Sequence, residues 1–330
     1  MSKFRRKRKK LPESNDLGLA VLWILTTAIA FALMLAVLNQ LLTGEPESTA
    51  ASAAVPAVSA RTAVVMDGNS GQVVYEKKGD ERVYPASTTK IMTALLGIEY
   101  GQLDRKVTVT GEAIGVEGSS IYLVAGEQLS MEDLLYAAML RSGNDAATAI
   151  AMEVGGSVEA FAELMNRRAL ELGAINTHFV NPTGLYDENH YTTAYDMALI
   201  GRAAMQNPTF AKIAGTKSWT ATRQEGRDPY FYNKNKVVQQ YEGGTGVKIG
   251  YTKASGRTLV ASSEREGRSV ICVVMDAPDW FNDAYRLMDW AYDTQELMTV
   301  EKERREKWID IRLSEAVWTR ERNSAPVIWR

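Results

Sequence analysis

Residues 84–96 read YPASTTKIMTALL, and the architecture that we expect for the chain is organised around this segment. Pro85 stands directly before an apolar run without helix breakers, so the sequence predicts a helix that begins near Ala86. Residues three apart share one face of a helix, which brings the Lys90 amine close to the Ser87 hydroxyl. A serine hydroxyl is a weak nucleophile until an adjacent base removes its proton, and Lys90 is the candidate base.

Two further short patterns follow, Ser142-Gly-Asn144 and Lys248-Ile-Gly250. A lysine acts as a base only if its surroundings lower its pKa from about 10.4, and Lys248 is a candidate source of the neighbouring positive charge. Each pattern alone is weak, because chance often produces a serine and a lysine three apart, and Ser-Gly-Asn alone is typical of a helix cap. Together, on a helix, a loop and a strand in this order, they indicate serine–lysine nucleophilic catalysis.

The segments on both sides of the predicted helix have the pattern of strands. Residues 62–66 and 72–75 are short β-rich runs around a Gly/Asn/Asp turn, which predicts a hairpin. Late in the chain, strands are expected at 246–251, 257–262 and 269–275, followed by a helix from about 282 to 297. Helices are expected between these strand regions, over 131–140, 146–154, 158–172 and 194–205. We therefore expect an α+β body whose sheet is completed by both chain ends and whose helical middle forms a second lobe.

Composition excludes several classes of protein. The chain has 330 residues, of which 45% are hydrophobic and 24% charged, as in ordinary globular proteins rather than disordered, collagenous or polytopic membrane proteins. One cysteine excludes an internal disulfide framework and a Cys-rich zinc site, and two histidines argue against a His-based metal centre. We therefore expect no metal and no cofactor. The net charge of −2 gives no support for a nucleic-acid partner.

The small net charge hides an asymmetry between the ends of the chain. Residues 1–16 hold seven basic and two acidic side chains, a net charge of +5, so the rest of the chain carries −7. Residues 17–42 contain no charge and exceed the roughly 20 residues that a membrane-spanning helix needs. The alternative is a cleaved signal peptide, but its apolar core is usually about 7–15 residues long. We expect an uncleaved signal anchor with a cytoplasmic N-terminus and an extracytoplasmic body. Residues 43–60, rich in Ala, Ser and Pro, are expected to form a flexible linker.

Beyond these patterns, the chain resembles serine-type D-alanyl-D-alanine carboxypeptidases, the low-molecular-weight penicillin-binding proteins of the S11 peptidase family. Four segments carry the resemblance: 84–96, 140–147 (LRSGNDAA), the block 177–196, and 246–252 (GVKIGYT). It covers nearly the whole body, so we assign 61–295 to the catalytic domain. The resemblance implies a β-lactamase/transpeptidase-like domain of two lobes, with an antiparallel sheet flanked by helices.

The resemblance also implies the roles of the catalytic residues. Ser87 would be the acylated nucleophile, Lys90 its general base and Ser142 a proton relay. The backbone N–H groups of Ser87 and Tyr251 would form the oxyanion hole. Ser87 would attack the carbonyl of the penultimate D-alanine of a peptidoglycan stem peptide, the terminal D-alanine would leave, and water would release the shortened peptide. β-Lactams would acylate the same serine and leave slowly.

Four further residues are expected to bind the substrate. Asn144 would hold a substrate amide, and Lys248 would attract the terminal carboxylate. Gly250 and Thr252 complete the expected set. A protein of this class would sit on a bacterial cell membrane through its single N-terminal helix.

Ile249 departs from the family pattern, which usually has Thr or Ser there to bind the substrate carboxylate. Losing one charge-assisted hydrogen bond costs on the order of 1.5–3 kcal/mol. Three interpretations stay open: a weaker carboxypeptidase, an endopeptidase, or compensation by Thr252 or Arg257. The rival functions are a β-lactamase, against which the block 177–196 argues, and a protein that binds cell-wall peptides without turnover.

The remaining candidate residues have simpler interpretations. His178 and His190 are expected to be structural, and Cys272, in an apolar strand, is expected to be a small buried hydrophobe. Residues 296–330 combine a charge run with Trp and Arg side chains. They could form a membrane-surface helix or pack on the body, and the sequence does not separate these two possibilities.

Overall fold

In the computed structural model, residues 54–294 are described. The basic tail (1–16), the predicted membrane segment (17–42) and the C-terminal segment (296–330) lie outside this range, so the expectations for them stay predictions. Within residues 54–294, no helix combines the length and the apolar character that crossing a bilayer requires. The predicted linker ends earlier than expected, because Ser59 and Ala60 already donate hydrogen bonds to the Asp283 carboxylate.

The largest element is a five-stranded antiparallel sheet with the strand order β2-β1-β9-β8-β7. The strands are β1 (Thr62–Asp67), β2 (Val73–Lys77), β7 (Gly244–Thr252), β8 (Gly256–Arg265) and β9 (Arg268–Met275). The two ends of the domain meet in this sheet, with Thr62 of β1 opposite Met275 of β9. This confirms the predicted hairpin, the three late strands and the sheet completed by both chain ends.

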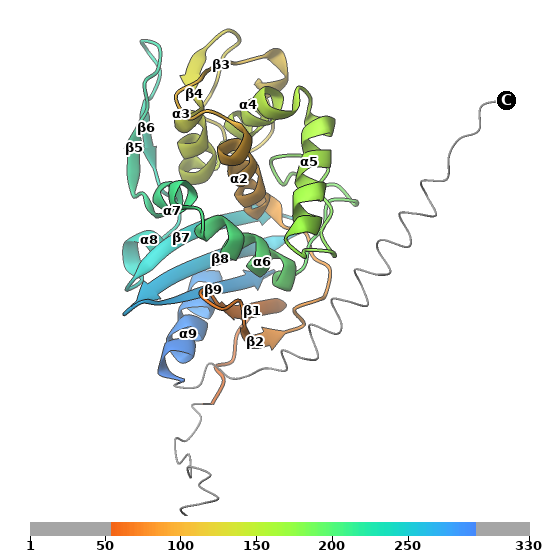
Figure 1. Cartoon of the computed structure of the whole chain (residues 1–330), viewed down its shortest axis with the longest axis vertical. Coiled ribbons are helices and arrows are strands. Elements are labelled where there is room, and N and C mark those ends of the chain that lie inside the picture. The colour runs from red at the N-terminus through yellow and green to blue at the C-terminus, as the bar shows by residue number, and fades with distance from the viewer. Residues whose placement is uncertain (1–53, 295–330) are drawn as a thin grey trace, which may run out of the picture. The chain divides into compact units, whose positions relative to one another are not determined.

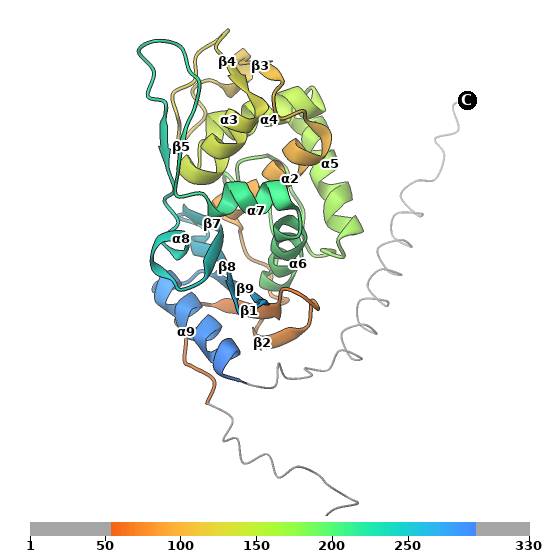
Figure 2. The same ribbon diagram turned by 60° about the vertical axis from the view of Figure 1, so that its left-hand side comes forward.

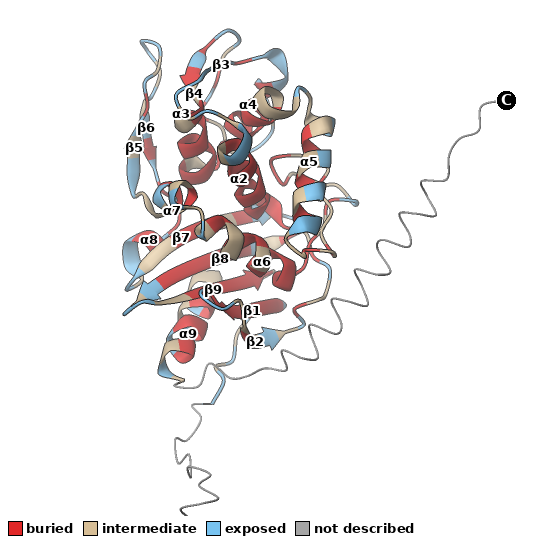
Figure 3. Ribbon diagram, viewed as in Figure 1, coloured by how far each residue is buried: buried red, intermediate tan, exposed pale blue. Residues whose placement is uncertain are grey.

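Helices cover both faces of the sheet (Figures 1 and 2). Side chains alternate between the two faces of a strand, and in β9 the odd-numbered residues 271, 273 and 275 enter the main core, while 270, 272 and 274 enter a second core. The main core packs under α6 (Ala194–Met205) and α2 (Lys90–Tyr100), and the second under α9 (Trp280–Asp293). Cys272 is fully buried in the second core, as predicted. Figure 3 shows that β1, most of β8 and β9, and most of α2 are buried, whereas β2 and β7 are partly exposed.

The rest of the domain is mainly helical. It contains α3 (Met131–Tyr136), a π-helical turn at Ala137–Arg141, α4 (Asn144–Gly155), α5 (Val158–Glu171), α7 (Pro208–Gly215) and α8 (Val237–Gln240). Two small two-stranded antiparallel sheets, β3 (Lys106–Thr108) with β4 (Gln128–Ser130) and β5 (Ser218–Thr220) with β6 (Tyr230–Tyr232), border this region, together with a 3-10 turn at Gly111–Ala113. The sequence predicted α5 and α6 well, but it missed α7, α8 and both small sheets.

The regular α-helix of the nucleophile segment begins about one turn later than the sequence predicts. Ala86–Thr89 form a 3-10 turn, and the regular helix α2 starts only at Lys90. Ala86 has a φ of +49°, and Gly184 lies against its carbonyl so closely that a Cβ on Gly184 would be 1.7 Å from that oxygen. Because no side chain fits there, the loop that contains Gly184 can approach the start of the turn that presents Ser87.

Candidate active site

The Lys90 amine lies at the centre of the site and contacts three oxygen atoms. Its Nζ is 3.1 Å from Ser87 Oγ, 2.6 Å from Asn144 Oδ1 and 2.7 Å from the Thr183 carbonyl oxygen. Lys90 is completely buried at the start of α2. The contact between Ser87 and Lys90 that the spacing predicted is therefore present, even though the intervening turn is 3-10 rather than α-helical.

The surroundings of Lys90 favour its neutral form. Burial is the main cause that lowers its pKa well below the ordinary value, and the positive charge of Lys248 lowers it further, which agrees with the expected role of Lys248 as a neighbouring charge. A neutral amine has two N–H groups and one lone pair. The Asn144 and Thr183 oxygens can only accept, so they take the two N–H groups and leave the lone pair facing the Ser87 hydroxyl. This is the arrangement that a general base for Ser87 requires.

Lys248 is a second fully buried lysine, on β7. Its Nζ donates hydrogen bonds to Ser142 Oγ and to the Ile249 carbonyl, both at 3.0 Å. Burial lowers the pKa of Lys248 to about 7, with a further contribution from the charge of Lys234. Among the residues that the structure describes, neither Lys90 nor Lys248 forms an ion pair with a carboxylate.

The second motif turns a corner between α3 and α4. Ser142 follows the π-helical turn and has a left-handed backbone with a φ of +63°, and α4 begins at Asn144. This corner places Ser142 Oγ within hydrogen-bond distance of Lys248 and Asn144 Oδ1 within hydrogen-bond distance of Lys90. One short segment thus contacts both lysines. The Asn144 Nδ2 group donates to the Glu117 carbonyl, so both ends of this amide have partners within the protein.

Gly250 brings β7 against the nucleophile. A Cβ at this position would lie 2.8 Å from the Ser87 backbone nitrogen and 2.5 Å from Thr258 Oγ1, so no other residue fits. The next two residues of β7, Tyr251 and Thr252, line the same cleft as Ser87. The strand thereby brings all three predicted positions, 250, 251 and 252, to the site.

The cleft above Ser87 has a volume of about 600 Å³. Its walls are formed by the loop at 117–119, the loop at 183–186, and the end of β7 with the turn that follows, and Asn144 lies within it. The sequence did not single out the Thr183 carbonyl, which can be reached only through the fold. The resemblance of the block 177–185 to the family was the one signal that pointed there.

Ile249 does not line the catalytic cleft. Its side chain is partly buried against the second core, and it pairs with Leu259 of β8. The cleft is lined by Tyr251 and Thr252 of β7 but not by Ile249. This position argues against a direct effect of the missing hydroxyl on the substrate carboxylate.

The two residues proposed to compensate for Ile249 have partners elsewhere. The Arg257 guanidinium donates to the Pro278 carbonyl at 2.9 Å and lies 5.9 Å from the Trp280 ring centroid. Thr252 Oγ1 is 2.8 Å from Ser255 Oγ within the β7–β8 turn. Compensation by Arg257 has no support in these contacts.

His190 is structural, as expected. Its Nδ1 accepts the Val180 N–H at 3.2 Å, so its Nε2 carries the proton and donates to Thr89 Oγ1 at 2.9 Å. Burial lowers the pKa of His190 to about 4, so the ring is neutral at pH 7. His190 thus ties the block 177–196 to the turn that carries Ser87.

Comparison with known proteins agrees with this geometry. Residues 48–279 match the peptidase S11 family, described as D-alanyl-D-alanine carboxypeptidase. The carboxypeptidase DacF of Bacillus subtilis is 36% identical over 245 residues, which cover 72% of this chain and 63% of that protein. The carboxypeptidase DacB2 of Mycobacterium tuberculosis is 33% identical over 74% of this chain and 86% of its own length.

Solved structures give the same result. A variant of the Streptomyces K15 DD-transpeptidase superimposes with a TM-score of 0.68 at 30% identity, and covers 72% of this chain and 99% of that one. A D-alanyl-D-alanine carboxypeptidase from Mycobacterium tuberculosis superimposes with a TM-score of 0.70 at 31% identity, over 74% of this chain and 94% of that one. The expected α+β fold, an antiparallel sheet with flanking helices, is confirmed.

Proposed function

Because the chain belongs to the S11 family of D-alanyl-D-alanine carboxypeptidases, we propose that it removes the terminal D-alanine from peptidoglycan stem peptides. One observation carries the proposal: the buried Lys90 amine gives its two N–H groups to Asn144 and Thr183 and faces Ser87 Oγ at 3.1 Å. A structural serine would not need a neutral lysine beside it, whereas a nucleophile does.

Acylation follows from this geometry. Ser87 Oγ attacks the carbonyl carbon of the penultimate D-alanine while its proton moves to Lys90 Nζ. The carbonyl oxygen becomes an oxyanion beside the Ser87 backbone nitrogen, against which Gly250 allows β7 to pack. When the C–N bond breaks, the leaving amine takes the proton that Lys90 accepted from Ser87, which returns Lys90 to its neutral form, and terminal D-alanine departs. Ser142, which accepts a hydrogen bond from Lys248 at 3.0 Å, would carry that proton if the substrate bridges the two lysines.

Deacylation uses the same groups in the opposite sense. Water gives a proton to neutral Lys90, and its oxygen attacks the acyl carbon. The bond to Ser87 Oγ then breaks, and Ser87 recovers its proton from Lys90. A β-lactam would acylate Ser87 by the same route, with its amide nitrogen as the leaving group.

The negative charge of the substrate carboxylate would affect the protonation of the two buried lysines. A C-terminal carboxylate near Lys248 would stabilise the ammonium form, whose pKa burial holds at about 7 in the free protein. Lys248 would then be charged and Lys90 neutral, so the two lysines would have different tasks. Intact Ser87 and Lys90 support turnover over binding alone.

Membrane attachment belongs to the same proposal. The uncharged segment 17–42 and the net charge of +5 before it support a single-pass anchor with the N-terminus in the cytoplasm. The catalytic domain would then face the cell wall. A fusion of residues 1–60 to a reporter that is active only outside the cytoplasm should give signal, and a cytoplasmic reporter in its place should not.

The enzymatic proposal is tested by labelling and product analysis. Fluorescent penicillin should label the wild-type protein and not Ser87→Ala, while the exposed control Ser218→Ala should label normally. Mass spectrometry should show loss of one alanine from a stem pentapeptide with the wild type alone. No label on the wild type would refute the proposal, label without product would favour a binding protein, and rapid penicillin turnover would favour a β-lactamase.

A further inference from the structure

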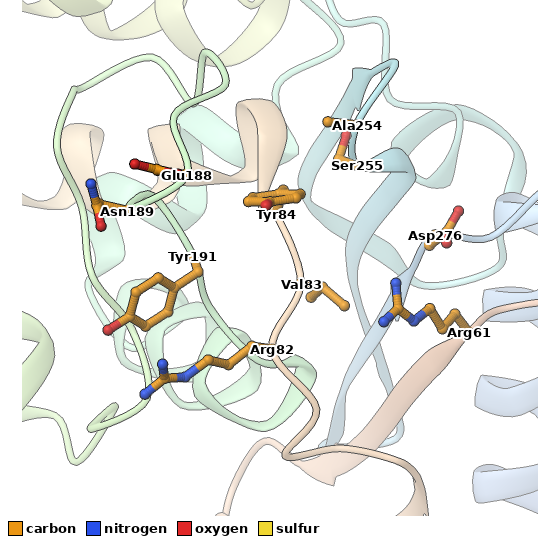
Figure 4. Close-up of a pocket in the computed structure, with 10 residues that line it drawn as sticks. All are labelled: Arg61, Arg82, Val83, Tyr84, Glu188, Asn189, Tyr191, Ala254, Ser255 and Asp276. Carbon is orange, nitrogen blue, oxygen red and sulfur yellow. The ribbon is translucent and has the colours of Figure 1, made fainter.

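A second cavity lies beside the catalytic cleft, and the proposed reaction does not use it (Figure 4). Its volume is about 550 Å³, within the roughly 300–1,000 Å³ of small-molecule sites. Tyr84 lies between the segment that carries residues 188–191 and the turn at 254–255 (Figure 4). The cavity is lined by Arg61, Arg82, Val83, Tyr84, Glu188, Asn189, Tyr191, Ala254, Ser255 and Asp276.

The two cavities share a wall. Ala254, in the β7–β8 turn, lines both of them. On the other side Tyr84, which lines the second cavity, meets Tyr186 of the catalytic cleft edge to face, with ring centroids 5.0 Å apart. Tyr84 is also only three residues before Ser87. A ligand held at Ser87 can therefore continue over this wall into the second cavity.

The walls of the second cavity are held by backbone hydrogen bonds. Val83 exchanges two backbone hydrogen bonds with Thr192, both of 2.9 Å, which joins the Tyr84 side to the segment that carries Tyr191. On the opposite side, the Arg61 N–H donates to the carbonyls of Met275 and Asp276. The cavity is therefore formed by the fold itself and needs no ligand to shape it.

The charges of the lining balance. Two arginines, Arg61 and Arg82, stand with two acids, Glu188 and Asp276. Arg61 is already bound to Glu81, whereas Arg82 forms no ion pair within residues 54–294 and lies 4.3 Å from the Tyr191 ring centroid. Such a site offers hydrogen-bond donors and acceptors together without a strong net field. It suits a ligand whose polar groups each donate and accept, more than a simple anion or cation.

We propose that the second cavity binds a saccharide, namely the sugar to which the stem peptide of the substrate is attached. The inference rests on the proposed function. Sugar hydroxyls both donate and accept, so they match the mixed lining of Arg82, Asn189 and Glu188. The Tyr84 ring provides apolar surface with a polar end, and the Arg82 guanidinium over the Tyr191 ring places donors beside it. The peptide would lie in the catalytic cleft and its sugar beyond the shared wall.

The test compares two substrates that differ only in the sugar. The kcat/KM for a stem pentapeptide carrying its disaccharide and for the same pentapeptide alone is measured for the wild type and for Arg82→Ala/Asn189→Ala. We expect the wild type to prefer the sugar-bearing substrate and the double variant to lose about tenfold on that substrate alone. Arg167→Ala removes another exposed arginine, one that lines neither cavity, and as the control it should keep the wild-type ratio.

The outcomes separate the two proposals. Unchanged penicillin labelling of the double variant shows that the Ser87 site is intact. An equal loss on both substrates would assign the cavity to the peptide and overturn the inference, as would no loss on either. If the wild type cleaves neither substrate, the proposed function fails instead.

Discussion

Arg223 and Lys90 both have buried basic groups, but Arg223 meets a carboxylate and Lys90 does not. Arg223 forms a double contact with Glu127, and both side chains are almost completely excluded from solvent, with 1% and 0% exposed. Lys90 and its neighbour Lys248 have neutral partners instead, and the burial of both lowers their pKa values. The first site keeps its charges, and the second gives up at least one.

The difference distinguishes a buried charged group that stabilises the fold from a buried amine that takes part in the reaction. A buried ion pair keeps both groups ionised and reports little about function. A buried amine without a counter-ion can lose its proton near neutral pH, and that is the property a general base needs. Five variants test whether this distinction holds.

Removing the unpaired amine should affect catalysis most. Lys90→Met should lower the rate of penicillin acylation by about 10²–10⁴-fold, because Ser87 loses its base. Its free energy of unfolding should change by less than about 2 kcal/mol, since relief from burying an amine offsets the two lost hydrogen bonds. Stopped-flow labelling and urea unfolding measure the two effects. Normal acylation in this variant would remove Lys90 from the mechanism.

Breaking the paired site should have the opposite outcome. Arg223→Met should cost about 3–5 kcal/mol of unfolding free energy, because it leaves the Glu127 carboxylate buried and alone. Acylation per folded molecule should stay within about threefold, since Arg223 touches no residue of the catalytic motif. Arg105→Met, which breaks a partly exposed pair with Glu153, is the control and should cost at most about 1 kcal/mol. A similar cost for both variants would contradict the contrast.

His190 extends the contrast to a third buried base. Its pKa is about 4 in the folded protein, against 6.5 for an ordinary histidine, so only the unfolded chain takes up this proton between those values. Stability is therefore present above pH 6.5 and is lost as pH falls toward 4, by about 3 kcal/mol in total. Urea unfolding at several pH values should show this slope in the wild type and not in His190→Asn. The raised pKa of Asp196, about 6, acts in the opposite sense but equally in both proteins.

The pH dependence of the reaction tests whether Lys248 acts through its positive charge. Because its pKa is about 7, kcat/KM for an anionic substrate should fall about tenfold per pH unit above that value as the ammonium is lost. Lys248→Arg stays charged and should have no such alkaline decline, whatever its absolute rate. Identical pH profiles for the two proteins would show that the charge of Lys248 is not required.

Ile249 should give the smallest effect. Ile249→Thr places a hydroxyl against the second core and should cost about 1 kcal/mol of stability. Penicillin acylation and stem-peptide cleavage should change by less than about threefold, because the side chain does not line the cleft. A gain of tenfold or more would restore the view that this position limits substrate binding.

Some parts of the fold could be predicted from the amino-acid sequence alone, and others could not. Local signals worked where one residue determines the local structure: Thr193 caps α6 through the Asp196 N–H, and α6 occupies the predicted residues 194–205. They failed for the small sheets, such as Ser218–Thr220 with Tyr230–Tyr232, because strands of three residues leave too little pattern.

The site shows the same division. The pairing of Ser87 with Lys90 follows from a spacing of three residues, and the sequence predicted it. The Thr183 carbonyl reaches Lys90 only because Gly184 packs on Ala86, and backbone oxygens carry no residue-type signal. The direction of Ile249 depends on the register of β7 against β8, which sets which face each residue takes.

The pairing of β1 with β9 has a consequence for how the protein folds. Strand β1 is made early and its partner β9 last, so their contact closes almost the whole length of the domain, and contacts of this kind slow folding. A chain still being synthesised holds Ser87 and Lys90 but lacks β7 to β9, and with them Lys248 and the strand that packs on the nucleophile. Reactivity therefore arises only when the last strand has joined the first.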